Sequence, residues 1–312
     1  MDNNLMDTEN IYKIVDKLID DLPDELKNTS NPIEIDLVLD GGIFNGSYLT
    51  GALFFIKEME KRNYIKIKRI SGCSIGALVG FLYFIDGLDL VTKFYDIIIK
   101  HFKKTCNFEI YKDLKKHLNG RIPLDVCKKV NKKLFITYNN IQTGLKKVKS
   151  VYKTEDEIID TIIRSSFFPY LIDGNIANKD KYIDGFNPYI FKPRNKRRIL
   201  FMDLSGLDKF TNILNIKNEK TNFYRILSGI LDIHIFLTKQ TETFMCSYVD
   251  EWNYSNKIRL YIRLIIEQII CYMSYLVILF KKYMTTNYND NYNIISKLLY
   301  DILFLLIHKY CL

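Results

Sequence analysis

The sequence predicts one α/β domain followed by a helical region. Two apolar, β-branched runs each end in a glycine-containing turn and lead into a helix-like segment, as βα units do. Residues 206–312 are mostly helical in pattern and rich in Ile, Leu, Tyr and Phe. With 312 residues, 48% of them hydrophobic, the chain can bury a large core.

The first 32 residues are expected to form a separate helical segment. Residues 1–10 are polar and acidic without an apolar signal core, and an amphipathic helix is predicted over residues 11–22. We therefore divide the chain into an N-terminal helical segment (1–32), a main domain (33–205) and a helical C-terminal region (206–312) that completes or extends the domain.

The first βα unit contains a glycine loop. A strand predicted at residues 35–39 leads into Asp40, Gly41 and Gly42, and a helix is expected over residues 47–61. Such a loop leaves backbone N–H groups free at a helix N-terminus, where they can bind a phosphate or form an oxyanion hole. It can also be a tight turn that binds nothing. The dinucleotide and Walker patterns are both absent here.

The second βα unit contains the motif G-x-S-x-G at residues 72–76, with Ser74 at its centre. A strand is predicted before it and a helix after it, at residues 75–84. A serine at a sharp strand-to-helix turn is exposed to substrate, while Gly72 and Gly76 keep side chains out of the turn. Such a serine is suited to attack a carbonyl carbon, although the same five residues also occur in ordinary turns.

A third motif, Asp184-Gly185, follows a short predicted strand, and the glycine permits a turn that directs the carboxylate into a site. The pair Asp173-Gly174 follows no strand, so Asp184 is the better candidate. Elsewhere in this domain the sequence predicts helices over residues 89–104, 123–135 and 155–165, and strands over residues 146–152 and 198–204.

These three motifs, in this order, resemble the patatin-like phospholipases over residues 33–201. The family's glycine loop resembles the segment from Asp40 to Gly46, and its elbow matches residues 72–76. The segment 163–169 is similar to the Ala-Ser-x-x-x-Pro stretch before the family's aspartate. The resemblance implies a three-layer sandwich around a mostly parallel sheet, with a helical C-terminal extension.

The resemblance also implies an activity, that of a lipid acyl hydrolase of phospholipase A or lipase type. Asp184 would take the proton of Ser74, which would attack a fatty-acyl ester and form an acyl-enzyme. The N–H groups of Gly41, Gly42 and Ile43 would stabilise the oxyanion, and neither a cofactor nor a metal is expected.

Three residues depart from the family pattern. Asn45 replaces a basic residue, Ile43 replaces the third glycine, and Phe186 replaces Gly or Ala. A catalytically degenerate lipid-binding protein therefore remains an alternative. Another is a generic α/β-hydrolase esterase with a Ser-Asp-His triad, since His234 follows Asp184 in the order that this fold requires. His234 lies in an apolar, helix-like run, where a buried structural role is more common.

Charge and cysteine usage point to an intracellular protein at a membrane surface. The net charge is +9, with basic clusters at residues 100–104, 128–133 and 192–198, which suits approach to an anionic membrane. The last cluster lies between two predicted strands, so no nucleic-acid partner is expected. The six cysteines are scattered without metal-site spacing and are expected to be reduced.

The C-terminal region contains an apolar stretch at residues 264–280 that includes Glu267. A membrane-spanning helix needs about 20 apolar residues, and a central charge is costly. We therefore expect a buried or interfacial helix, with Glu267 facing water or a partner, and a peripheral rather than a membrane-spanning protein.

Overall fold

The computed structural model describes residues 3–27, 31–118, 120–193, 197–206, 212–217, 219–287, 301–302 and 304–311. The strands are β1 (Ile33–Leu39), β2 (Ile65–Cys73), β3 (Leu134–Asn140), β4 (Leu145–Lys149), β5 (Tyr182–Asp184), β6 (Arg198–Met202) and β7 (Cys246–Tyr248). The helices are α1 (Asn3–Asp20), α2 (Asp24–Lys27), α3 (Gly46–Lys61), α4 (Ile75–Phe84), α5 (Leu90–Thr105), α6 (Leu114–Leu118), α7 (Val126–Val130), α8 (Glu155–Ser165), α10 (Phe223–Lys239) and α11 (Tyr254–Asn287). Short 3-10 helices are η1 (Ile43–Asn45), η2 (Glu109–Asp113) and η3 (Val249–Glu251).

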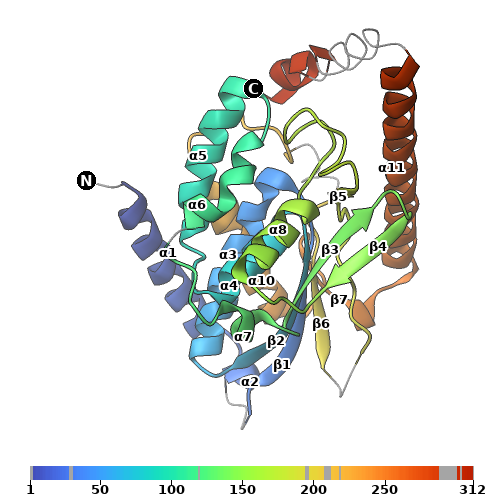
Figure 1. The fold of residues 1–312 in the computed structure, drawn as a ribbon. Helices are drawn as coiled ribbons and strands as arrows, with labels where there is room; N and C mark the ends of the chain where they lie inside the picture. Colours follow the sequence, from blue (N-terminus) through green and yellow to red (C-terminus); the bar gives the residue numbers. More distant parts are fainter. Residues whose placement is uncertain are drawn as a thin grey trace.

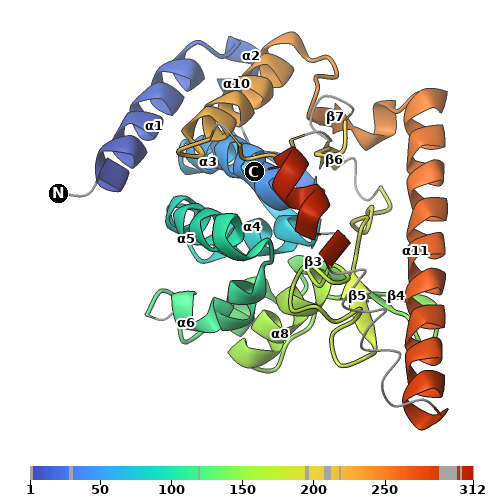
Figure 2. The ribbon, with the colours of Figure 1, turned by 90° about the horizontal axis from the view of Figure 1, so that it is seen from above.

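The strands form one mixed sheet in the order β4-β3-β2-β1-β6-β7, with β5 paired to β3. The central pairings β3-β2, β2-β1 and β1-β6 are parallel, whereas β4, β5 and β7 pair antiparallel at the margins. Most helices cover one side of the sheet, and α11 stands on the other (Figures 1 and 2). The predicted α/β fold, with a mostly parallel sheet and a helical C-terminal extension, is confirmed.

The parallel centre brings the ends of three strands together. Leu39 at the end of β1 pairs with Gly72 of β2 on one side and with Met202 of β6 on the other. The loops that follow these strands therefore meet at one edge of the sheet, as the carboxyl ends of parallel strands do. Asp40 and Ser74 begin two of these loops.

The main core lies between the sheet and the helices on its covered side, and α1 and α10 contribute to it with α3. Helices α3 and α10 pack backbone to backbone at two glycines. A Cβ at Gly51 would lie 1.9 Å from the carbonyl oxygen of Ile226, and one at Gly229 would lie 2.0 Å from that of Tyr48. A side chain at either position would push the two helices apart. It would thereby weaken the support that they give to the glycine loop.

One sequence-based element is wrong. A single helix was predicted over residues 123–135, but α7 covers only Val126–Val130 and β3 already begins at Leu134. The side-chain amide of Asn131 exchanges two hydrogen bonds with the backbone of Tyr152, at 2.7 and 3.1 Å. The next residue, Lys132, has φ 58°, so the chain turns out of the helix toward the sheet. Helix α1 also begins earlier than predicted, at Asn3.

Helix α11 is longer than the predicted stretch. One side carries buried charged residues, and the other side exposes apolar residues. Glu267 is buried and contacts residues of the main domain of the same chain, so it does not face water. The outer side exposes a band that we call the α11 apolar face, comprising Ile262, Ile265, Ile266, Ile269, Tyr272 and Met273. Among the described helices, the segment Tyr254–Tyr283 is long and apolar enough to cross a membrane by length and composition, with a mean hydropathy of 1.8.

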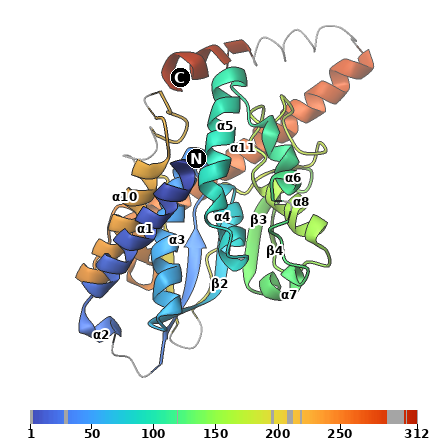
Figure 3. The same ribbon diagram turned by 90° about the vertical axis from the view of Figure 1, so that its left-hand side faces the viewer.

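The end of the described chain returns to the main body. Residues 304–311 are helical and lie near the end of α5 (Figure 3). Ile307 is buried there in a cluster that includes Phe44 and Phe102, and the carbonyl of Cys311 accepts a hydrogen bond from the N–H of Ile216 at 3.0 Å. Because Phe44 also lines the pocket described below, this segment supports one wall of that pocket.

Candidate active site

Ser74 occupies a strained turn between β2 and α4. Its backbone lies at φ 52° and ψ −129°, a conformation that non-glycine residues adopt at a cost of about 1–3 kcal/mol. Its N–H group is held by the carbonyl oxygen of Ser165 at 3.1 Å and by the Ser165 hydroxyl at 2.9 Å. A Cβ on Gly76 would lie 2.5 Å from the Asp40 carbonyl oxygen, and one on Gly72 would lie 2.6 Å from the Gly76 backbone. Both glycines are therefore needed for this turn.

Asp184 ends β5 opposite Tyr138 of β3. One of its carboxylate oxygens accepts a hydrogen bond from the N–H of Phe186 at 2.8 Å, which fixes the orientation of the carboxylate. A Cβ at Gly185 would lie 2.2 Å from the Thr137 carbonyl oxygen, so the residue after the aspartate must be glycine. The N–H of Gly185 donates to the same Ser165 carbonyl that holds Ser74, which ties the two turns together.

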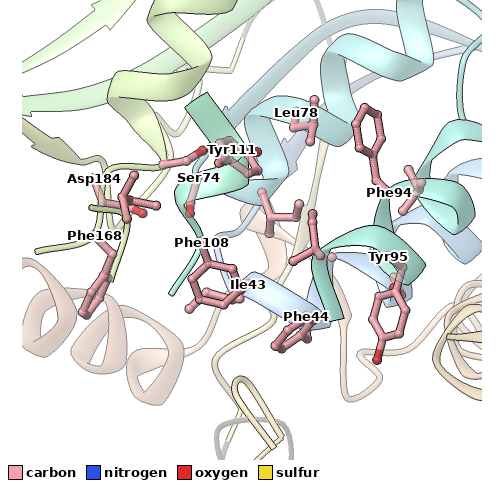
Figure 4. A pocket seen from close by; sticks show the side chains of 17 residues that line it. Ile43, Phe44, Ser74, Leu78, Phe94, Tyr95, Phe108, Tyr111, Phe168 and Asp184 are labelled. Atoms are coloured by element: carbon pink, nitrogen blue, oxygen red, sulfur yellow. Dashed lines mark hydrogen bonds between the residues drawn. The ribbon is translucent and has the colours of Figure 1, made fainter. Parts of the chain in front are cut away.

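Ser74 and Asp184 face the same pocket (Figure 4). Burial raises the pKa of Asp184 to about 7, and hydrogen bonding with the Ser74 side chain opposes this shift. A carboxyl with a pKa near neutrality can accept a proton from a serine hydroxyl and return it later, as tuned general bases do. The structure thus places the two candidate residues predicted from the sequence, Ser74 and Asp184, in one pocket.

The rest of the pocket is almost entirely apolar. Figure 4 shows Ser74 and Asp184 toward one end and Phe94 and Tyr95 toward the other. The apolar and aromatic lining residues are Ile43, Phe44, Ile75, Leu78, Val91, Phe94, Tyr95, Ile98, Phe108, Tyr111, Phe168 and Ile172. Ser47 and Ser166 also line the pocket. A mainly apolar pocket with Ser74 and Asp184 toward one end suits an acyl chain whose ester lies beside Ser74.

Cys73 and the histidines are poorly placed to act as nucleophile or base. Cys73 is fully buried, and burial raises the pKa of its thiol well above the ordinary value, so the thiol stays protonated. None of the four histidines lines the pocket. His234 lies on α10 with its ring edge-to-face on Phe55, the ring centres being 6.0 Å apart, and burial lowers its pKa.

The glycine loop lies directly beside Ser74. A Cβ at Gly41 would be 3.1 Å from the Cβ of Ser74, so the absent side chain leaves room at the nucleophile. The N–H of Gly41 donates to the Asp40 carboxylate at 2.9 Å. Among the described residues, the N–H groups of Gly42 and Ile43 donate no hydrogen bond, so they are available for an oxyanion.

Residues 37–186 match the family described as patatin-like phospholipase. The chain carries a patatin-like phospholipase domain. The matched segment contains the glycine loop, Ser74 and Asp184, and the family implies a lipid acyl hydrolase. No curated protein shows a significant match to this chain.

The departures of this patatin-like domain have structural consequences. Asn45 is buried, and its side-chain oxygen accepts a hydrogen bond at 2.5 Å from Arg225, a guanidinium 1% exposed on α10. Ile43 and Phe186 adopt left-handed backbone conformations, at φ 43° and 45°, where glycine is the least strained residue. Phe186 packs edge-to-face on Phe168 of the pocket wall, at 5.8 Å between ring centres.

Sequence reasoning missed several residues that support the patatin-like site. Ser165 holds both turns, and its segment, residues 163–169, is recognisable in the sequence only by its resemblance to the family's stretch before the aspartate. Arg263 of α11 forms an ion pair with the buried Asp40 at 2.5 Å. Burial raises the pKa of Asp40 to about 6 against the lowering effect of Arg263. The sequence did contain a signal for these residues: Arg263 and Glu267 are two charged residues four positions apart in a mainly apolar helix.

Proposed function

We propose that this protein is a lipid acyl hydrolase that cleaves fatty-acyl esters through Ser74 and Asp184. The observation that carries the proposal is their position toward one end of a pocket lined mainly by apolar and aromatic side chains. The family match supports the class of substrate. The mainly apolar lining favours an acyl chain over a polar substrate.

The reaction follows from the proposed roles. Asp184 accepts the Ser74 proton while the hydroxyl oxygen attacks the ester carbonyl carbon, and the oxyanion receives hydrogen bonds from the N–H groups of Gly42 and Ile43. Gly41 contributes a third N–H if its hydrogen bond to Asp40 opens. Collapse of the tetrahedral intermediate expels the alcohol, which takes the proton from Asp184. Water, activated by Asp184, then releases the fatty acid and regenerates Ser74.

Fatty-acid release from vesicles tests this activity. The full-length protein is expected to release free fatty acid from vesicles that contain phospholipid, neutral lipid or both, and the ratio between them gives the preferred class. Release should be unaffected by chelators, since the proposed chemistry uses no metal. Lipid binding without release from any of these vesicles would favour the degenerate, lipid-binding alternative.

We also propose that the enzyme works as a peripheral protein on an anionic lipid surface. The net charge of +9 supports attraction to such a surface, at about 1 kcal/mol for each nearby Lys or Arg. The α11 apolar face is the matching hydrophobic element. Arg263 and Glu267 tie the opposite side of α11 to the main domain, and the helix could not span a bilayer while keeping these contacts. If α11 lies at the membrane–water interface, its apolar face contacts lipid while its charged side keeps its contacts with the main domain.

Vesicle binding tests the surface proposal. The double variant Ile265→Ser/Ile269→Ser removes two side chains of the α11 apolar face, exposed by 59% and 56%, and is expected to weaken binding to anionic vesicles about tenfold or more. The control Leu124→Ser/Val151→Ser, which changes exposed apolar residues outside α11, should bind like wild type. Higher salt should weaken the binding of all three proteins. Retention in membranes after alkaline carbonate extraction, without aggregation, would instead mean that α11 spans the bilayer.

A further inference from the structure

The buried side of α11 carries two charged residues that contact the loops around the active site. Arg263 and Glu267 are four residues apart and so share one side of the helix. The Glu267 side chain is 1% exposed and that of Arg263 is 17% exposed, whereas Ile262 and Ile266 beside them are about half exposed. Charged side chains are rarely buried without specific partners, and both have several.

Arg263 joins loops that follow three different strands. Its guanidinium donates to Asp40 after β1 at 2.5 Å, to Asn187 after β5 at 2.8 Å, and to the hydroxyl of Ser205 after β6 at 2.7 Å. Asp40 in turn accepts the N–H of Gly41 in the glycine loop. A planar guanidinium with several fixed donors holds such a set of acceptors in a defined geometry.

Glu267 reaches the catalytic aspartate through one amide. It accepts hydrogen bonds from Asn139 at 2.7 Å and Asn187 at 2.8 Å, and forms an ion pair with Lys146 at 2.8 Å. The same amide nitrogen of Asn139 also donates to the backbone carbonyl of Asp184 at 2.9 Å. Glu267 therefore supports the strand end that presents the Asp184 carboxylate.

We propose that Arg263 and Glu267 are positioning residues for the Ser74–Asp184 pair, and that α11 is part of the catalytic unit although it lies outside residues 37–186. This inference rests on the proposed hydrolase function. Neither residue lines the acyl pocket, so both act through Asp40, Asn139 and Asn187 rather than on the substrate.

Electrostatics gives the proposal a specific signature. The Ser74 side chain and the N–H of Phe186 lower the pKa of Asp184, while the carboxylates of Glu267 and Asp40 raise it. Tyr111 of η2 and the Cys73 thiol also interact electrostatically with Asp184, and Lys146 of β4 and Arg263 of α11 act on the same thiol. Asp203 pairs with Arg263. Replacing Glu267 with glutamine removes one of the two charges that raise the pKa of Asp184 and leaves Lys146 without its partner. Both changes favour the ionised form of Asp184.

The pH dependence of kcat/KM on a soluble short-chain nitrophenyl ester tests the inference in the full-length protein. For Glu267→Gln, the acid limb is expected to move to lower pH by about one pH unit, because the base is ionised over a wider range. The control Glu25→Gln removes the same charge from an exposed position on α2 and should keep the wild-type profile. The Arg263→Lys variant keeps the positive charge but loses the planar guanidinium with its several hydrogen-bond donors. Its kcat should fall about 10²-fold with little change in KM.

The outcomes separate this inference from the proposed function. An inactive wild-type protein would contradict the hydrolase proposal itself. An active wild type with folded Glu267→Gln and Arg263→Lys variants that keep both its pH profile and its kcat would overturn the positioning role. Loss of cooperative thermal unfolding in both variants would also overturn it, because the pair would then be required for folding rather than for placing the catalytic groups.

Discussion

Replacing Ser74 with alanine is expected to lower kcat by about 10⁴-fold or more, with the fold and substrate binding retained. The strained turn holds only the backbone of Ser74 in place, through Ser165, and alanine keeps those hydrogen bonds. The variant therefore loses the attacking oxygen without losing the pocket. Steady-state hydrolysis of a short-chain ester and thermal unfolding measure the two effects.

Cys73→Ala is the matched control for Ser74→Ala. Cys73 is adjacent in the chain and fully buried, and its thiol stays protonated, so its removal should leave kcat within a few-fold of wild type. A large loss of activity in Cys73→Ala, together with retained turnover in Ser74→Ala, would show that Cys73 and not Ser74 is the nucleophile.

Replacing Asp184 with asparagine is expected to be nearly as damaging, because the amide cannot accept the serine proton. The double variant Ser74→Ala/Asp184→Asn should be little worse than either single variant, since paired catalytic residues act as a unit. His234→Ala should retain most of the activity, because its ring faces Phe55 and not the pocket. A folded His234→Ala protein as inactive as Ser74→Ala would favour the Ser-Asp-His alternative.

The raised pKa of Asp184 predicts opposite effects of pH on activity and on stability. The base form is required, so kcat/KM should rise as the pH passes through about 7 and level off above it. The folded state binds this proton more tightly than the unfolded chain, whose aspartate has a pKa near 3.8. The contribution of Asp184 to the free energy of unfolding should therefore fall as the pH rises from about 4 to 7. In Asp184→Asn, this part of the pH dependence should disappear.

The local architecture of the site could be predicted because short-range signals encode it. Helices α4 and α8 match their predicted ranges, since one follows the elbow directly and the other has three acidic residues in its first turn. Gly72, Gly76 and Gly185 each leave space for a backbone carbonyl or a turn that any Cβ would obstruct. Only the contact between Gly72 and Gly76 is local in the sequence, whereas Gly76 and Gly185 make room for the carbonyls of Asp40 and Thr137. All three glycines can be recognised because they lie within the short motifs around Ser74 and Asp184.

The contribution of α11 could not be predicted, because it depends on contacts between residues that lie 58 to 223 positions apart. Arg263 pairs with Asp40 and Glu267 with Lys146, and no local pattern specifies either partner. From the sequence alone, the central charge Glu267 indicates only that the apolar run is unlike a membrane-spanning helix. The end of the helix predicted at residues 123–135 was missed for a similar reason, since Asn131 turns the chain by bonding to Tyr152.

Covalent trapping of the nucleophile tests the central claim most directly. An alkyl fluorophosphonate modifies an activated serine, so peptide mass spectrometry of the treated wild-type protein should locate a single adduct on Ser74. Ser74→Ala should carry no adduct, and Asp184→Asn should react far more slowly. An adduct on another residue of the wild-type protein, or a rate unchanged in Asp184→Asn, would contradict the assignment of Ser74 and Asp184 as nucleophile and base.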